Sequence, residues 1–228
     1  MIRQPCEALL VDLDGVLRVF DPGHLPRVEQ RHGLAAGAIS QAAFATDPLR
    51  RVVTGQISHD EWLAATAESL TGSVATKLVA GLASGPAAEQ VGEPVAVAAV
   101  AEWASHRGSV QSEELAVVRE VRAAGIPVAI ASNASDWLDA DLDALGLLGE
   151  VDVVVNSSVV GHAKPSAEFF AAACRAVAVP PARCLFVDDD TRNVTGARAA
   201  GLAAYRYTGT ADLRYVRAAV TGPREASG

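Results

Sequence analysis

The chain has few of the features that mark membrane-spanning or disulfide-stabilised proteins. Of its 228 residues, 5% are aromatic, three are cysteines and only two of the 19 basic residues are lysines. Cys6, Cys174 and Cys184 form no CxxC pair, and their odd number argues against a disulfide framework. We expect them to be small buried side chains in a reducing cytoplasm. The longest apolar run, residues 95–101, is far shorter than the roughly 18 residues of a membrane-spanning helix, so no membrane association is expected.

The sequence also lacks runs of basic residues, and no signal peptide is expected. The formal net charge is −8 and no cluster of Lys and Arg could neutralise several phosphates, so nucleic acid is not expected as a partner. The first seven residues lack the apolar stretch of a signal peptide. Half of the residues are hydrophobic, which excludes disorder for the bulk of the chain and allows a sizeable core. We expect a cytoplasmic globular protein, either a monomer or a homodimer.

The second half of the chain alternates between strand and helix patterns. Together with residues 7–13, strands are expected at residues 128–131, 151–156, 184–187 and 202–207. Helices are expected between them, at residues 112–124, after a Ser135 cap, at 165–177 with Pro165 in the first turn, and at 193–200. Regular alternation of this kind predicts an α/β fold with a doubly wound, Rossmann-like parallel sheet and right-handed crossovers.

A long helical block interrupts this alternation after the first strand. Apolar residues there recur at helical spacing, and Ser58 and Glu61 have the spacing of a capping box that opens a helix through Trp62. Residues 81–94, rich in Gly, Pro and Ala, are expected to break the block. We therefore predict a catalytic core of residues 1–17 and 109–228, and an inserted α-helical cap of residues 18–108.

Polar residues gather where the predicted strands end, which is the edge of a parallel sheet where ligands bind. In strand order they are Asp12 and Asp14, then Ser132 and Asn133, then Lys164, and finally Asp188, Asp189 and Asp190. Each of them alone has a structural explanation, such as an Asx turn, a solvated loop or an ordinary surface lysine. Their convergence on neighbouring strand ends favours a functional site.

Two further observations favour a functional site at this edge, and the second favours a metal there. Lys164 stands in a chain that otherwise uses arginine almost throughout, and a compact ammonium group differs from a planar guanidinium. Four aspartates are expected to lie close together at adjacent strand ends: Asp12, Asp14, Asp188 and Asp189. Their negative charges would repel one another unless a cation lay between them. An oxygen-only ligand set without clustered His or Cys favours Mg²⁺.

These elements together resemble the haloacid dehalogenase superfamily of phosphotransferases and hydrolases. Residues 10–17, residues 131–133, Lys164-Pro165 and residues 186–201 are similar to its four motifs, in the same order. The helical insert between the first two motifs is similar to that of the subclass with an α-helical cap. Gly55 to Ser58, followed by Trp62, resembles a cap segment of small sugar-phosphate phosphatases.

The resemblance implies a role for each catalytic residue. Asp12 would be the nucleophile that forms an aspartyl-phosphate, and Asp14 would protonate the leaving oxygen and then activate water. Ser132 and the backbone N–H of Asn133 would hold the phosphoryl oxygens, while Lys164 would balance charge in the transition state.

It also implies a magnesium site. Asp189 aligns with the direct metal ligand, joined by Asp12 and the backbone carbonyl of Asp14, with Asp188 as an additional ligand. Asp190 departs from the family, which often has Ser or Thr there; its carboxylate could tighten the metal site or point to solvent.

We therefore expect a Mg²⁺-dependent phosphatase acting on a small phosphorylated metabolite, with sugar or polyol phosphates as the leading class. The alternatives are a phosphomutase on the same fold and a non-catalytic regulatory or binding relative. A dehalogenase is disfavoured because family dehalogenases lack the second aspartate, Asp14. Arg18, His24 and Arg27 could reach a second substrate group, but exposed basic residues on a polar helix are the favoured interpretation.

Overall fold

The structure is a computed structural model that describes residues 5–79 and 91–221. The chain divides into two compact units. One comprises Met1–Val19, Val53–Gly55 and Ser109–Gly228, and the other comprises Phe20–Val52 and Gln56–Gly108. Each unit has a hydrophobic core of its own.

The larger unit, called the core unit below, is built on a five-stranded sheet whose order is β5-β4-β1-β6-β7. Its strands are β1 (Ala8–Val11), β4 (Val128–Ser132), β5 (Val153–Asn156), β6 (Cys184–Asp188) and β7 (Ala203–Arg206). Every neighbouring pair is parallel. The chain builds outward from the central β1 to β5 and then crosses to the other side of β1, so the predicted doubly wound α/β sheet is confirmed.

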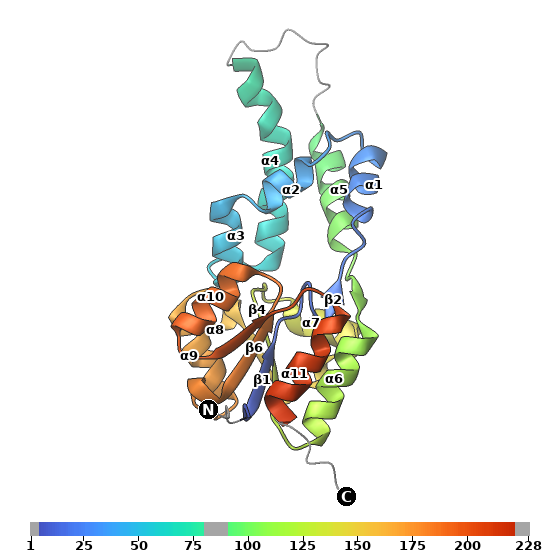
Figure 1. The fold of residues 1–228 in the computed structure, drawn as a ribbon. Coiled ribbons are helices and arrows are strands. Elements are labelled where there is room, and N and C mark those ends of the chain that lie inside the picture. Colours follow the sequence, from blue (N-terminus) through green and yellow to red (C-terminus); the bar gives the residue numbers. More distant parts are fainter. Residues whose placement is uncertain (1–4, 80–90, 222–228) are drawn as a thin grey trace, which may run out of the picture. The chain divides into compact units, whose positions relative to one another are not determined.

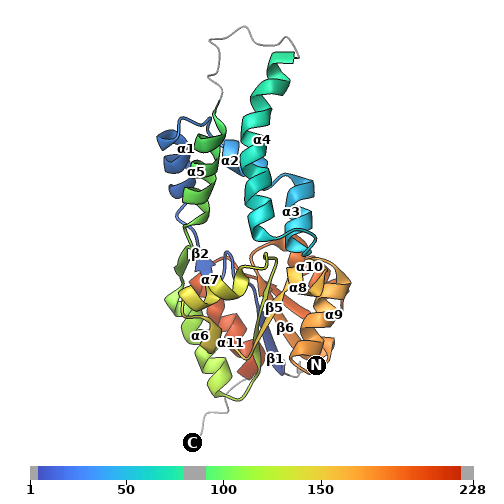
Figure 2. The same ribbon diagram turned by 180° about the vertical axis from the view of Figure 1, so that it is seen from behind.

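Helices cover both faces of this sheet, as Figures 1 and 2 show. Leu9 and Val11 pack with α6 (Ser112–Ala123), α7 (Leu138–Ala144) and α11 (Leu213–Thr221). Ala8 and Leu10 pack on the opposite face, with α9 (Ala167–Ala176) and α10 (Thr191–Ala199). Since successive strand residues point to opposite faces, a strand of four buried residues serves both layers, which explains its uninterrupted apolar sequence.

The smaller unit, called the helical unit below, consists of helices within its described residues. They are α1 (His24–Arg31), α2 (Ala38–Ala43), α3 (Thr46–Val53), α4 (His59–Val79) and α5 (Glu93–Ala104). The predicted capping box is confirmed at the start of α4: Ser58 N–H donates to Glu61 Oε2 at 2.7 Å, and Glu61 N–H donates to Ser58 Oγ at 3.2 Å. Most of the predicted break at residues 81–94 lies outside the described residues.

Two details differ from the sequence prediction. The helix expected from Pro165 begins instead at Ala167, because Ser166 accepts a hydrogen bond from Phe169 N–H and forms the N-cap; the Lys164–Pro165 peptide bond is cis. A two-residue antiparallel ribbon, β2 (Arg18–Val19) with β3 (Ser109–Val110), was not expected. Strands this short carry no detectable alternation of polar and apolar residues.

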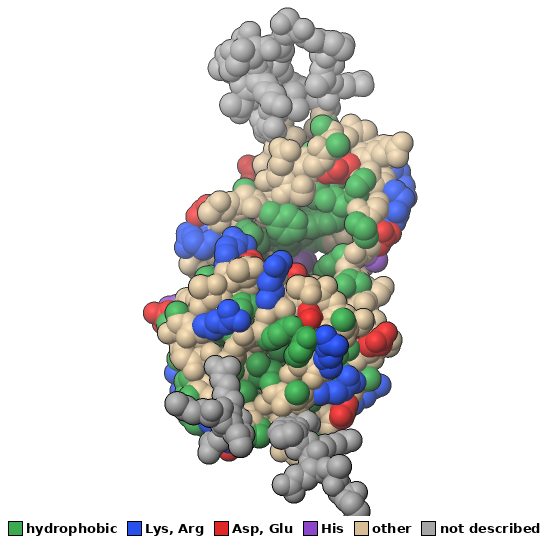
Figure 3. All heavy atoms as spheres, in the orientation of Figure 1, with side chains coloured by type: hydrophobic (Ala, Val, Ile, Leu, Met, Phe, Trp, Pro, Cys, Tyr) green, Lys and Arg blue, Asp and Glu red, His purple; other side chains and the backbone are tan. Residues whose placement is uncertain are grey.

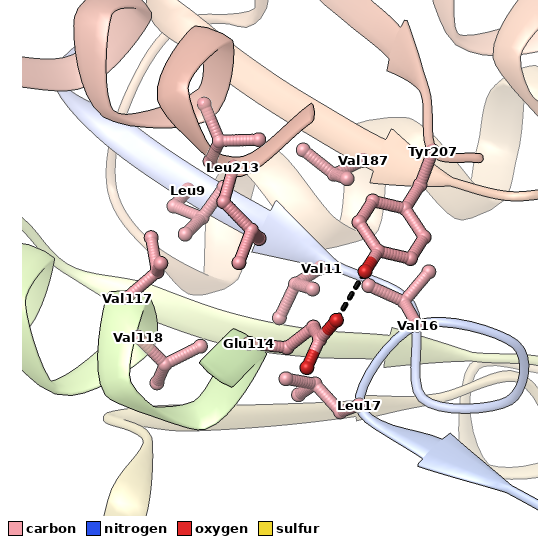
Figure 4. Close-up of a pocket in the computed structure, with 11 residues that line it drawn as sticks. Leu9, Val11, Val16, Leu17, Glu114, Val117, Val118, Val187, Tyr207 and Leu213 are labelled. Atoms are coloured by element: carbon pink, nitrogen blue, oxygen red, sulfur yellow. Dashed lines mark hydrogen bonds between the residues drawn. The ribbon is translucent and has the colours of Figure 1, made fainter. Parts of the chain in front are cut away.

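A small cavity of about 20 Å³ lies inside the core unit, between the sheet and helices α6 and α11. Figure 4 shows that its lining is apolar except for two groups, and that the Tyr207 hydroxyl donates a hydrogen bond to Glu114. Burial, reinforced by this hydrogen bond, raises the pKa of Tyr207. The cavity is thus a gap in the hydrophobic core and does not contain the aspartates predicted for the site.

None of the helices in residues 5–79 and 91–221 combines the length and the apolar character that a membrane crossing requires. On the face drawn in Figure 3, acidic and basic side chains are interspersed over the core unit.

Candidate active site

The first aspartate of the site follows directly on the central strand. Asp12 N–H donates to Val187 O of β6 at 2.9 Å, so the backbone stays in the sheet up to this residue. Its carboxylate accepts a hydrogen bond from Leu13 N–H at 2.7 Å and the residue is 6% exposed. Gly15 has a φ of +84°, and a Cβ there would lie 2.3 Å from Asp189 Oδ2. The turn after β1 therefore requires glycine both for its backbone angle and for its close approach to Asp189.

Lys164 lies between two of the predicted aspartates. Its Nζ is 2.7 Å from Asp12 Oδ1 and 2.8 Å from Asp188 Oδ2, and its side chain is 1% exposed. Burial acts to lower the pKa of Lys164, but the two carboxylates outweigh it and raise the pKa above its ordinary value. The ammonium group therefore stays charged and links the ends of β1 and β6.

Asp188 is the most thoroughly hydrogen-bonded residue of the site, and it is fully buried. Besides Lys164, it accepts from Asp190 N–H at 2.8 Å and from Asn193 Nδ2 at 3.0 and 3.2 Å. Both latter donors belong to the start of α10, so this helix holds the Asp188 carboxylate in place. The donors supply part of the compensation that a buried carboxylate requires.

Asp190 does not join the other aspartates. Its Oδ1 accepts from Arg192 N–H at 2.8 Å as the N-cap of α10, and its Oδ2 pairs with Arg192 Nη2 at 2.6 Å. The hydrogen bond from Arg192 lowers the pKa of Asp190. This extra carboxylate is therefore used to cap a helix and to bind a neighbouring arginine.

Three carboxylates approach closely enough to share a cation. Asp12, Asp188 and Asp189 each offer an oxygen, and these oxygens lie within 4.8 Å of one another. Burial, and next to it the Asp188 charge, raise the pKa of Asp12 to about 8 despite the adjacent Lys164. The same two causes raise the pKa of Asp189. Because a single ammonium leaves this group with excess negative charge, the set is suited to a hard divalent cation that prefers oxygen ligands.

Ser132 and Asn133 lie at the end of β4, next to β1. Ser132 is 2% exposed. The Asn133 side chain bonds twice to the Lys164 backbone: its Nδ2 donates to Lys164 O at 3.0 Å and its Oδ1 accepts from Lys164 N–H at 2.7 Å. Asn133 therefore holds in place the loop segment that carries Lys164.

Sequence reasoning missed the residues that support this loop. Ala134 N–H donates to Ser157 Oγ at 3.0 Å, and Asn156 Nδ2 donates to Ser135 O at 2.7 Å. Asn156 is the last residue of β5 and Ser157 begins the next helix, α8 (Ser157–Val160), so an Asn-Ser pair at a strand end was the available signal. They fix the path of the backbone just after Ser132.

Asp14 and the basic residues after it differ most from expectation. The Asp14 carboxylate is bound by Arg18, and within the described part of the chain it is not a member of the three-carboxylate cluster. Arg18 is buried in β2, so its assignment to an exposed helix face was wrong. Arg27 of α1 is exposed and pairs with Asp21, while the His24 ring stacks on His106 with 4.4 Å between centroids. His162, considered for its nearness to Lys164 in sequence, is exposed.

Comparison with known proteins connects this geometry with a family. A family model for haloacid dehalogenase-like hydrolases matches residues 6–201. A phosphatase of Mycobacterium tuberculosis is 38% identical over 90 residues, which are 39% of this chain and 42% of the relative. The validoxylamine A 7'-phosphate phosphatase of Streptomyces hygroscopicus is 29% identical over 83 residues, 36% of this chain and 39% of that protein. The matched region thus spans less than half the length of these curated relatives.

Solved structures share the fold at low sequence identity. An enzyme of the haloacid dehalogenase family from Bacteroides thetaiotaomicron superimposes with a TM-score of 0.65 at 18% identity, over 90% of this chain and 95% of that one. The same enzyme in complex with magnesium and inorganic phosphate gives 0.61 at 20% identity, over 89% and 94%. The L-2-haloacid dehalogenase of Xanthobacter autotrophicus gives 0.59 at 21% identity, over 96% and 85%. Because the family model covers most of the chain, from strand β1 past the end of α10, this chain belongs to the haloacid dehalogenase-like hydrolase family.

Proposed function

We propose that this protein is a Mg²⁺-dependent phosphatase that acts on a small phosphorylated metabolite through an aspartyl-phosphate intermediate. The observation that carries the proposal is the buried contact of Lys164 with both Asp12 and Asp188, beside the third carboxylate of Asp189. The proposed nucleophile, the Lys164 ammonium group and the candidate metal ligands lie together at the carboxyl ends of β1 and β6, the edge at which parallel sheets bind ligands, and this supports the proposal.

Asp12 is the proposed nucleophile. Its carboxylate oxygen attacks phosphorus, the bond from phosphorus to the leaving oxygen breaks, and Asp14 gives that oxygen a proton. Asp14 then takes a proton from water, the water oxygen attacks phosphorus, and the bond to Asp12 breaks. Phosphate is released and both aspartates return to their starting states.

The remaining residues would stabilise the transferred group. The Lys164 ammonium, the Ser132 hydroxyl and the Asn133 backbone N–H are proposed to bind phosphoryl oxygens, whose negative charge must be offset in the transition state. Asp12, Asp189, the Asp14 backbone carbonyl and, as an additional ligand, Asp188 would hold Mg²⁺. When bound, the ion would supply positive charge next to the phosphoryl group.

The substrate class is proposed to be sugar or polyol phosphates. Gly55 to Ser58 with Trp62 resembles a cap segment of sugar-phosphate phosphatases, and one relative is named for the 7'-phosphate of validoxylamine A. We propose that residues 18–108 act as the cap that selects the substrate. The core of residues 1–17 and 109–228 would carry the chemistry.

The test is phosphate release from a panel of phosphorylated sugars, polyols and other metabolites, with Mg²⁺ and with excess EDTA. We expect release that requires Mg²⁺ and is abolished in Asp12→Asn, because an amide oxygen is a poor nucleophile. The matched control is Asp143→Asn, an exposed aspartate of α7. Release by Asp12→Asn would exclude Asp12 as the nucleophile. Isomerisation of a sugar phosphate without net release would indicate a phosphomutase, and Mg²⁺ binding without either reaction would indicate a binding protein.

A further inference from the structure

The turn after β1 brings a second charged residue beside Asp14. Gly15 N–H donates to Arg18 O at 2.8 Å and Arg18 N–H donates to Leu13 O at 2.7 Å, so the turn closes on itself and places the two side chains together. Arg18 Nε then lies 2.6 Å from Asp14 Oδ1, and Nη2 lies 3.1 Å from Oδ2. This is the two-point contact of a guanidinium with both carboxylate oxygens, which fixes orientation as well as distance.

A third residue holds Arg18 from the other side. Arg18 Nη1 donates to Asp141 Oδ2 of α7 at 3.1 Å, so the guanidinium lies between two carboxylates that are 127 positions apart in sequence. The Arg18 side chain is only 6% exposed, and that of Asp141 is 25% exposed. Burying a guanidinium is unfavourable unless it is paired, and here helix α7 and the backbone of the ribbon β2–β3 both restrict it.

The contact leaves one side of Asp14 open. Arg18 occupies one lone pair on each carboxyl oxygen of Asp14, and the two oxygens have further hydrogen-bonding sites that it leaves free. The Asp14 side chain is 44% exposed although its partner is buried. One side of the Asp14 carboxyl group is therefore fixed by Arg18, while the other side remains accessible. A group that exchanges a proton with a bound molecule needs such access. A lysine could not hold it in this way, since an ammonium group lacks the planar fork.

We propose that Arg18, held in place by Asp141, is a positioning residue that fixes the Asp14 carboxylate in the orientation from which it serves the leaving oxygen. This inference rests on the proposed phosphatase function. In this role Arg18 and Asp141 act on the reaction only through Asp14. In the step that releases the leaving group, their effect therefore depends on how strongly the leaving oxygen needs a proton.

Leaving-group dependence distinguishes positioning from a purely structural role. The rate of leaving-group release in the first turnover, before water attacks the aspartyl-phosphate, is measured with an alkyl phosphate, whose leaving oxygen needs a proton, and with p-nitrophenyl phosphate, whose leaving group departs readily without one. We expect Arg18→Gln to lower this rate for the alkyl phosphate by about 100-fold, the lower end of a general acid's contribution, and to change the rate for p-nitrophenyl phosphate much less. Asp141→Asn should give the same selectivity with a smaller loss, while the control Asp143→Asn on the same helix should behave as wild type.

The results separate this inference from the proposed function. If wild type releases phosphate from both compounds but Arg18→Gln lowers the two first-turnover rates equally, Arg18 has only a structural role and the inference is wrong. A selective gain with the alkyl phosphate would also overturn it, because Arg18 would then restrain Asp14 from acting. If Arg18→Gln does not fold, Asp141→Asn decides in the same assay. Inactivity of wild type towards the whole panel and both compounds would instead overturn the proposed function, and this inference with it.

Discussion

Asn133 and Lys164, 31 residues apart in sequence, exchange two hydrogen bonds between the side chain of one and the backbone of the other. The side-chain amide of Asn133 forms hydrogen bonds with both the backbone N–H and the backbone carbonyl of Lys164, as the backbone of a neighbouring strand would. The lysine ammonium can then reach Asp12 and Asp188 at 2.7 and 2.8 Å. Its position is thus determined by a residue at the end of β4 as much as by its own loop.

The first prediction concerns Asn133→Ala. This change removes both hydrogen bonds and leaves the Lys164 N–H and carbonyl without them, which should lower the free energy of unfolding by about 1–3 kcal/mol. A displaced ammonium group should also lower kcat by up to about 100-fold. Urea unfolding and phosphate release measure the two effects. Asn133→Asp keeps the acceptor but loses the donor, so its stability and kcat should lie between those of wild type and Asn133→Ala. An unchanged kcat in the alanine variant would show that Asn133 does not position the lysine for catalysis.

A second prediction follows from the raised pKa of Asp12, about 8 compared with an ordinary value of 3.8. Between these two pH values the folded, metal-free protein retains a proton that the unfolded chain has released. The free energy of unfolding should therefore fall as pH rises from about 4 to 8, by at most about 1.4 kcal/mol per pH unit from this group. Unfolding in urea with EDTA, repeated across that window, measures the slope.

Asp12→Asn is the control for this prediction, because it removes the titrating group while keeping the shape of the side chain. Its slope across the window should be less negative than that of wild type. Saturating Mg²⁺ should also make the wild-type slope less negative, since a bound cation favours the ionised carboxylate of Asp12. Identical slopes in wild type and Asp12→Asn would place the retained proton elsewhere.

How far the sequence predicted the site depends on whether a residue acts through its position in the sheet or through a distant contact. Asp12, Ser132 and Asp188 were predicted, because strands of near-continuous apolar residues end in polar ones and a parallel sheet brings those ends together. The capping box at Ser58 and Glu61 was predicted for a similar reason, since both partners lie within one helical turn.

Two of the misses have different causes, a distant partner in one and a competing local signal in the other. Arg18 resembles an exposed basic residue until Asp141 of α7 is brought to it by the folded core unit. Pro165 satisfies the rule for a first helical turn, but the next residue, Ser166, is a better N-cap and delays the start of the helix. No local pattern reports the contact of Arg18 with Asp141, because it forms only in the assembled fold, whereas the Ser166 cap is a local signal that competes with the rule for proline.

A third prediction separates two neighbouring carboxylates. Asp189 is a member of the three-carboxylate cluster, whereas Asp190 caps α10 and binds Arg192. Asp189→Asn should weaken Mg²⁺ binding by about tenfold or more, and Asp190→Asn should leave it nearly unchanged, since asparagine is also a good N-cap. Isothermal titration calorimetry measures both dissociation constants. The reverse order would mean that Asp190 turns from Arg192 to the ion.

The fourth prediction concerns Gly196, where α10 approaches the residue that follows Lys164. A Cβ at Gly196 would lie 2.5 Å from Pro165 O and 2.6 Å from Pro165 Cβ. Alanine is normally about 1 kcal/mol better than glycine inside a helix, but here the added methyl group must push α10 and Pro165 apart, at a cost of about 1–3 kcal/mol for overpacking. Gly196→Ala should therefore be less stable to urea than wild type, and less active because Lys164 is displaced.

Gly149→Ala is the matched control for that change, since beyond its immediate chain neighbours no atom of the described residues lies within 4 Å of a Cβ there, and its φ is not in the left-handed region. It should be neutral or slightly stabilising, because alanine restricts the unfolded chain, and its rate of phosphate release should equal that of wild type. If Gly196→Ala behaves in the same way as Gly149→Ala in both assays, α10 does not determine the position of Pro165, and other contacts, such as those with Asn133, determine the backbone path of the lysine.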